Sequence, residues 1–144
     1  ASHSTRTGST AMICLDNSVL RRFASPNTSP AVDAYLEDHA AVPWVIPATV
    51  AFEYYAHYET QAEIRTQKRE LNAHLDGILP LTDDVASEAA QLQVLLQKQG
   101  VSLALGDLLH AATAREAGAT FVTRDGDFDS EPLEDLMAID IIES

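Results

Sequence analysis

Acidic side chains lie beside several of the apolar runs of this chain. Asp16 ends the run MICLD, Asp125 closely follows FVT, and Asp107 precedes an alanine-rich segment. Glu53 lies a few residues after WVIP, residues 44–47. Carboxylates gathered in a partly buried place repel one another, and a hard divalent cation such as Mg²⁺ or Mn²⁺ offsets that cost. Because a cation held in this way can activate water for attack on phosphorus, these residues point to metal-dependent phosphodiester hydrolysis.

Simpler roles compete with this interpretation. Asp16 and Asp107 each stand where a helix N-cap would be, and Asp125 belongs to an Asp-Gly turn. Glu53 alone is better explained as a solvated or paired side chain than as a ligand. With 22 acidic residues in a chain of 144, any four carry little information. Their shared position beside apolar runs is what favours a common site.

Apolar runs alternate with helical patterns along the chain, which predicts an α/β fold with a parallel sheet between helices. The predicted strands are 11–15, 44–47, 78–81, 119–123 and 137–142, and the predicted helices are 17–25, 30–40, 48–75, 84–99 and 107–117. Ligands of such sheets bind beyond the carboxyl ends of the strands, so we expect the acids to meet there. We predict one domain over 11–144, preceded by a Ser/Thr-rich disordered tail or cloning remnant at 1–10.

The charge of the chain is strongly acidic. It carries 22 acidic and 9 basic residues, a net charge of −13, and only two lysines. Such a chain repels nucleic acid in ordinary salt. Either the protein does not bind nucleic acid, or it comes from a salt-rich (halophilic) cytosol in which the charges are screened. We favour the second interpretation. No apolar run approaches the roughly 20 residues of a membrane span, and the single Cys14 fits a buried thiol. We therefore expect a soluble, cytoplasmic protein.

Other residue types have weaker functional interpretations. His57 and His110 follow Glu53 and Asp107 by one helical turn and could bind a softer metal such as Zn²⁺. Packing near the carboxyl edge of the sheet, the rim at which the acids are expected, explains them better. Three tyrosines could stack on unpaired bases, but core or dimer packing is favoured. These are Tyr54, Tyr55 and Tyr58. The candidates for phosphate contact are Arg21, Arg22, Arg65, Lys68, Arg69 and, best by position, Arg124.

Three segments together resemble the PIN domain family, and within it the VapC-like toxin ribonucleases. The first is MICLDNSVL, an apolar strand, an aspartate, and then small polar residues. The second is PATVAFEYY, with a glutamate on a helix after the second strand. The third is GDLLHAATAREAGATFVTRDGDF, an aspartate, an alanine-rich helix, a glycine, and a strand ending in threonine and an acid. The resemblance extends over residues 11–144.

The resemblance implies a three-layer α/β/α fold with a five-stranded parallel sheet and a carboxylate site for Mg²⁺ or Mn²⁺. Carried over by position, that site is Asp16, Glu53, Asp107 and Asp125, with Asp127 as a fifth carboxylate and Asp129 left to solvent. Ser18 and Thr123 would orient a phosphate or a water, and Asn17 stands where the family usually has threonine. Family members cut RNA, are inhibited by an antitoxin, and often form homodimers.

Two other classes of protein remain open. A catalytically silent PIN-like module would bind RNA or protein without cutting, and the modest basic surface fits it. A phosphatase or phospho-receiver on a similar sheet fits less well. The phosphatase pattern requires a second aspartate at the position where Ser18 stands. A phospho-receiver requires a lysine after a late strand, and the sequence has no lysine after Lys98.

Overall fold

A five-stranded parallel sheet forms the centre of the protein, as expected. The computed structural model describes residues 11–25 and 29–143, so the predicted tail at 1–10 lies outside the described residues. The strands are β1 (Ile13–Leu15), β2 (Trp44–Pro47), β3 (Gly77–Leu79), β4 (Thr120–Thr123) and β5 (Ile139–Ile141). Their order is β3-β2-β1-β4-β5, and every neighbouring pair is parallel.

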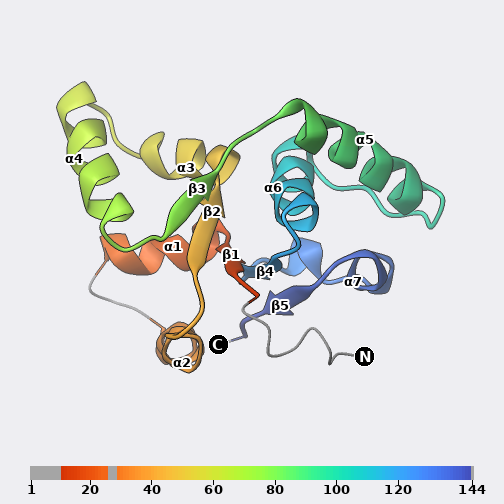
Figure 1. The fold of residues 1–144 in the computed structure, drawn as a ribbon, viewed down its shortest axis with the longest axis horizontal. Helices are drawn as coiled ribbons and strands as arrows, with labels where there is room; N and C mark the ends of the chain where they lie inside the picture. Colours follow the sequence, from red (N-terminus) through yellow and green to blue (C-terminus); the bar gives the residue numbers. More distant parts are fainter. Residues whose placement is uncertain (1–10, 26–28, 144) are drawn as a thin grey trace.

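Helices cover both faces of this sheet (Figure 1). They are α1 (Asn17–Ala24), α2 (Pro30–Asp38), α3 (Ala48–Tyr55), α4 (Gln61–Asn72), α5 (Asp83–Gln97), α6 (Leu105–Glu116) and α7 (Glu131–Leu136), with a 3-10 turn η1 (Gly126–Phe128). One face packs against α1 to α4 and the other against α5 to α7. The three-layer α/β/α prediction is therefore confirmed. None of the helices among the described residues is long and apolar enough to cross a membrane.

Alternation along the strands explains the two layers. Neighbouring side chains of a strand point to opposite faces, so a fully apolar strand supplies two cores. Cys14 and Phe121 face the α5–α7 layer, whereas Leu15 and Val122 face the α1–α4 layer. The central strands β1 and β4 are buried on both sides, and Cys14 is a buried free thiol, as predicted. Its burial raises the pKa of the thiol well above its usual range.

The single long helix predicted over 48–75 is wrong. The structure breaks it into α3 and α4, separated by residues 56–60. A capping box begins α4: Thr60 Oγ1 accepts a hydrogen bond from the Glu63 backbone N–H at 3.1 Å, and the Glu63 carboxylate accepts one from the Thr60 N–H at 3.0 Å. Because these bonds satisfy donors that only a helix start leaves open, the T-x-x-E pattern marks a new helix.

Two further boundaries differ from the predictions. Helix α6 begins at Leu105 rather than at Asp107, and its N-cap is Ala104, so Asp107 lies within the first turn and is not a cap. The segment after β4, where the sequence analysis places no helix, contains η1 and α7, and Ser130 caps α7. The earlier start of α6 matters for the site, because it sets where Asp107 lies along the helix.

The strand order reverses between β1 and β4. From β1 the sheet grows through β2 to β3, and then the chain returns to place β4 on the other side of β1. The Asp16 backbone N–H donates to the Val122 carbonyl at 2.9 Å and ties the ends of these two strands together. Such a switch point opens a crevice at the carboxyl ends of the strands, where ligands of α/β proteins bind.

Candidate metal centre

The carboxylate of Asp16 stands at the end of β1 and is held by three donors. Its Oδ1 accepts from the Asn17 N–H at 2.8 Å, and its Oδ2 accepts from Thr123 Oγ1 at 2.7 Å and from Ser18 Oγ at 3.1 Å. The residue is 6% exposed and caps α1. Asp16 is thus the N-cap of α1, as its simpler interpretation predicts. Its carboxylate is also held in one position at the rim by these three hydrogen bonds.

Thr123 and Ser18 connect this carboxylate to the loop after β4. Thr123 Oγ1 also accepts from the Asp125 N–H at 2.9 Å, and Ser18 Oγ accepts from the Arg124 N–H at 2.9 Å. Each hydroxyl therefore donates to one acid and accepts from the loop backbone. Both side chains position Asp16 relative to the loop that carries Asp125.

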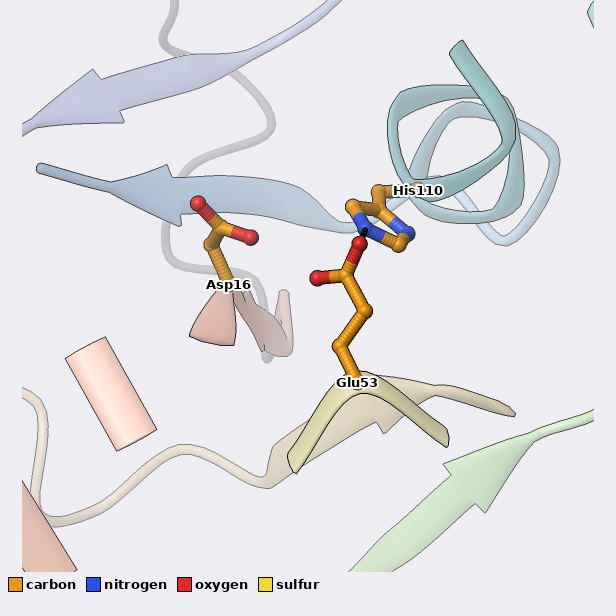
Figure 2. Close-up of side chains that lie close together, drawn as sticks. All are labelled: Asp16, Glu53 and His110. Atoms are coloured by element: carbon orange, nitrogen blue, oxygen red, sulfur yellow. Dashed lines mark ion pairs between the residues drawn. The ribbon is translucent and has the colours of Figure 1, made fainter. Parts of the chain in front are cut away.

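Glu53 and His110 approach Asp16 from two other elements. Figure 2 shows the Glu53 carboxylate, on α3, directed at the imidazole of His110 on α6, with Asp16 beside them. The Glu53 Oε2 to His110 Nε2 distance is 3.1 Å; the Glu53 side chain is 41% exposed and that of His110 is 1% exposed. Ligand atoms of these three residues lie within 4.8 Å of one another.

The imidazole of His110 is fixed from one side only. Its Nδ1 lies 2.8 Å from Thr49 Oγ1, while the contact of Nε2 with Glu53 is close but does not meet hydrogen-bond geometry. A buried ring nitrogen without a hydrogen-bond partner is uncommon, and a bound ion or water would satisfy it. Gly106 leaves the space for this arrangement, because a Cβ there would lie 3.3 Å from Glu53 Oε2.

A second acidic group lies at the same rim. It consists of Asp107 on α6, together with Asp125 and Asp127 in the loop after β4, and its ligand atoms also lie within 4.8 Å of one another. The Asp125 carboxylate accepts from the Asp127 N–H at 2.9 Å, so the turn role expected of Asp125 is real. Asp127 and Asp129 are exposed, and Asp129 belongs to neither group.

The surroundings of Asp107 join the two groups. Desolvation by burial raises the pKa of its carboxyl, and the charges of Asp125, Asp16 and Asp127 raise it further, while His110 lowers it. No hydrogen bond to this carboxylate contributes among the described residues. The charges of acids from both groups act on Asp107, so the two groups adjoin each other. The negatively charged rim that we expected as one group is therefore made of two neighbouring clusters.

This donor set fits a hard divalent cation. Carboxylate oxygens are the preferred ligands of Mg²⁺ and Mn²⁺, and Mn²⁺ also accepts an imidazole. Ligands bound at about 2.1 Å lie at most about 4.2 Å apart, close to the spacing within each cluster. Two features would be satisfied by a cation: the Nε2 of His110, which makes no hydrogen bond, and the Asp107 carboxylate, which accepts none among the described residues.

The sequence predicts the acids at one rim and His110 packed beside it, and the structure places His110 there, buried and in contact with Glu53. The spacing of His110, four residues from Gly106 and three from Asp107, was visible, yet only the structure shows its ring turned toward Glu53. His57 is exposed, packs edge-on against Tyr58 at 5.5 Å, and lies in neither cluster. Tyr54 belongs to the core, with Tyr55 and Tyr58 packed against it, so the packing interpretation of the tyrosines is the better one.

A family model for the PIN domain matches residues 13–130 of the chain. Solved structures agree with it in fold. VapBC2 from Rickettsia felis, bound to a DNA fragment from their promoter, superposes with a TM-score of 0.71 at 15% identity, covering 92% of this chain and 99% of that one. FitAcB from Neisseria gonorrhoeae gives 0.68 at 23% identity, covering 89% and 96%.

VapBC-5 from Mycobacterium tuberculosis, a member of the VapBC family of toxin-antitoxin systems, is also similar. Its TM-score is 0.60 at 26% identity, and the match covers 93% of this chain and 99% of that one. No curated protein sequence matches the chain at a significant level.

Proposed function

Because the chain belongs to the PIN domain family, we propose that it is a Mg²⁺- or Mn²⁺-dependent endoribonuclease and the toxin of a VapBC-type toxin–antitoxin pair. The observation that carries this proposal is the meeting of two acidic clusters at the switch point, where the Asp107 carboxylate has acids of both clusters around it. Carboxylates left in such a place are destabilising unless a cation neutralises them.

The proposed cation ligands divide between the two clusters. Asp16, Asp107 and Asp125 would hold a cation, Asp127 would add a fifth carboxylate, and Glu53 would hold a second ion or orient the attacking water. When bound, the cation supplies charge neutralisation and an activated water for attack on phosphorus. No side chain of the rim needs to serve as a covalent nucleophile.

The chain's own residues also position the substrate. We propose that Arg124, beside Asp125, binds a phosphate of the RNA, because its backbone is fixed by the Ser18 hydroxyl. Ser18 and Thr123 are bonded to the Asp16 carboxylate, which supports a role in positioning that ligand more than direct contact with phosphate. Their loss would therefore act through Asp16.

An antitoxin is the proposed protein partner. Beside Glu53 and His110 lies an open hollow of about 400 Å³ whose walls include Phe52, Leu81 and Leu105. These three side chains are 70%, 51% and 71% exposed. Apolar side chains gathered next to a negatively charged rim suit a segment that offers both apolar and cationic residues, such as an arginine placed among the carboxylates.

Three further proposals concern the assembly, the location and the salt environment of the protein. A homodimer is one, and sedimentation velocity of the purified chain tests it. A cytoplasmic location and a salt-rich cell are others, the latter supported by the net charge of −13. A salt series with unfolding measured at each concentration tests the halophilic proposal, because a halophilic chain gains stability as multimolar salt is added.

Cation-dependent RNA cleavage tests the proposed function. The purified chain is assayed on total RNA with a chelator, Mg²⁺ or Mn²⁺, beside Asp16→Asn, Asp107→Asn and the matched control Asp129→Asn. We expect cleavage only with cation, lost in the first two variants and retained in the control. RNA binding without cleavage, or equal traces of cleavage in all chains, would favour the silent binding module instead.

A further inference from the structure

Cationic side chains are scarce on this protein, yet three of them line one hollow. The chain has 9 basic residues against 22 acidic ones. Arg21 and Arg22, in the last turn of α1, meet Arg124 of the loop after β4 around a hollow of about 280 Å³. The fold thus brings together cations from nearly opposite ends of the sequence, against the overall sign of the protein.

The lining of this arginine hollow suits an anion. Among the described residues that line it none is acidic, and the hydroxyl residues Ser18, Ser25 and Ser29 contribute to its wall. Arg22 forms an ion pair here, since its Nε donates to Asp33 Oδ1 at 2.5 Å. This bond uses one of the five N–H donors of the guanidinium and fixes its position. No ion pair within the described residues involves Arg21.

Ser18 joins the arginine hollow to the candidate metal centre. It lines the hollow, its hydroxyl donates to Asp16 Oδ2 at 3.1 Å, and the same oxygen accepts from the Arg124 N–H at 2.9 Å. One side chain therefore separates a cationic hollow from an anionic rim. A nucleic-acid strand that crosses Ser18 would have one phosphate at the rim and the next in the hollow.

Arg21 also borders a smaller hollow with an aromatic wall. This hollow, of about 130 Å³, is lined by Tyr54, His57 and Tyr58 among others. Aromatic side chains stack on unpaired bases, and arginines bind phosphate. Because Tyr54 is buried in the core and Tyr58 packs against it, the exposed His57 is the ring on which a base would stack. A cationic hollow beside this ring suits the phosphate and base of a nucleotide.

We propose that the arginine hollow binds the phosphodiester adjacent to the one that is cut, and so holds a single strand in register across the rim. This inference deepens the proposed function and rests on it. It also explains how a chain of net charge −13 binds RNA: the attraction is local, concentrated in three guanidinium groups beside the carboxylates. Salt weakens the long-range repulsion, and it also weakens each close arginine–phosphate contact, so that the number of contacts can be read from the salt dependence of binding.

Salt-dependent binding of a fluorescent 12-nucleotide single-stranded RNA of randomised sequence tests the hollow. Binding is measured by anisotropy with Ca²⁺ present to neutralise the rim, for the unchanged chain, Arg21→Gln, Arg21→Gln/Arg124→Gln and the control Lys98→Gln. Removing one arginine–phosphate interaction reduces the slope of log K against log salt by about 0.7 for a single strand. We expect reductions of about 0.7 and about 1.4 for the two arginine variants and none for the control.

Each outcome decides something. Equal slopes in all four chains, or no RNA binding by the unchanged chain, overturn the inference. Hexaglutamate that binds the unchanged chain and loses its binding in Arg21→Gln, with RNA slopes unaltered, assigns the hollow to an acidic protein segment and also overturns it. Hydrolysis of bis(4-nitrophenyl) phosphate with Mn²⁺ tests the carboxylate rim separately. If hydrolysis fails while the slopes change, the hollow stands as an RNA-binding site and the proposed cleavage beside it is overturned.

Discussion

Asp16 and Asp107 lie at the same edge of the sheet, yet the protein surrounds their carboxylates very differently. Asp16 is buried and accepts hydrogen bonds from Asn17, Ser18 and Thr123. Asp107 is half-buried, and among the described residues its carboxylate is raised in pKa by burial and acidic neighbours without a compensating hydrogen bond. The protein thus satisfies one acid with its own hydrogen-bond donors and leaves the other without them, a difference that the proposed cation site would explain.

The difference suggests a division of labour. A carboxylate held by three donors is a rigid ligand that fixes the geometry of a site, whereas an uncompensated one provides binding energy for a cation. Asp16 would then decide where the cation lies, and Asp107 how strongly it is bound. Four predictions test this contrast, from the largest expected effect to the smallest.

If both acids serve one site, their removal is not additive. Asp16→Asn and Asp107→Asn each lower the cation-dependent rate of RNA cleavage by about 10³-fold, and the double variant is hardly slower than either, as is usual for residues that act as a unit. Asparagine still caps a helix, so α1 survives the first change. Single-turnover rates at saturating Mn²⁺ measure this, and additive losses would indicate two independent sites.

Loosening Asp16 without removing it weakens cation binding. Thr123→Val deletes the donor to Asp16 Oδ2 and the acceptor of the Asp125 N–H in one nearly isosteric change. Loss of such supporting contacts costs about 10- to 100-fold in metal affinity. Calorimetric titration with Mn²⁺ measures the affinity, with Thr113→Val as a control because Thr113 is a buried threonine whose hydroxyl donates to the Leu109 carbonyl within its own helix. Equal affinities would remove Thr123 from the site.

His110 distinguishes between cations. Its Nε2 faces Glu53 without a bonded partner, and imidazole is a better ligand for Mn²⁺ than for Mg²⁺. His110→Gln is expected to lower Mn²⁺ affinity by about tenfold and to leave Mg²⁺ affinity nearly unchanged. His57→Gln, on an exposed histidine outside both clusters, should alter neither. Equal losses for both ions would mean that His110 only packs.

The raised pKa of Asp107 makes the cation-free protein less stable as pH rises. A folded carboxyl with a pKa above its ordinary 3.8 binds protons more tightly than the unfolded one, so stability falls as pH rises from that value through the folded pKa. Asp107→Asn lacks this loss, and above that window it melts a few degrees higher than the unchanged chain in chelator. Thermal unfolding from pH 3 to 8 measures it, and parallel curves would contradict it.

The sequence predicted more of the rim than of the helices around it. Acids that closely follow apolar strands must lie at the carboxyl edge of a parallel sheet. The sequence alone therefore predicts that Asp16 and Asp125 lie at this edge. The break between α3 and α4 was missed although Thr60 and Glu63 form a legible capping box. The helical pattern of apolar residues runs on in the sequence through residues 56–60, and it favoured one helix over 48–75 in spite of the capping box.

Other features were beyond sequence reasoning for a physical reason. The contact of Glu53 with His110 and the meeting of Arg21 with Arg124 depend on side-chain directions across long separations, which no local pattern encodes. Helix α6 begins two residues before Asp107 with an alanine as its N-cap and no side-chain cap bond, so its start carries no local signal. Local propensity places elements, and packing decides which of their side chains meet.

The measurement that bears most directly on a shared cation site is Mn²⁺ binding followed by electron paramagnetic resonance at the working pH. The unchanged chain should bind Mn²⁺ saturably, and the affinity should fall at least tenfold both in Asp16→Asn, from the hydrogen-bonded cluster, and in Asp107→Asn, from the uncompensated one. Retained affinity in either variant, or no saturable binding in the unchanged chain, would show that the two clusters do not form one site.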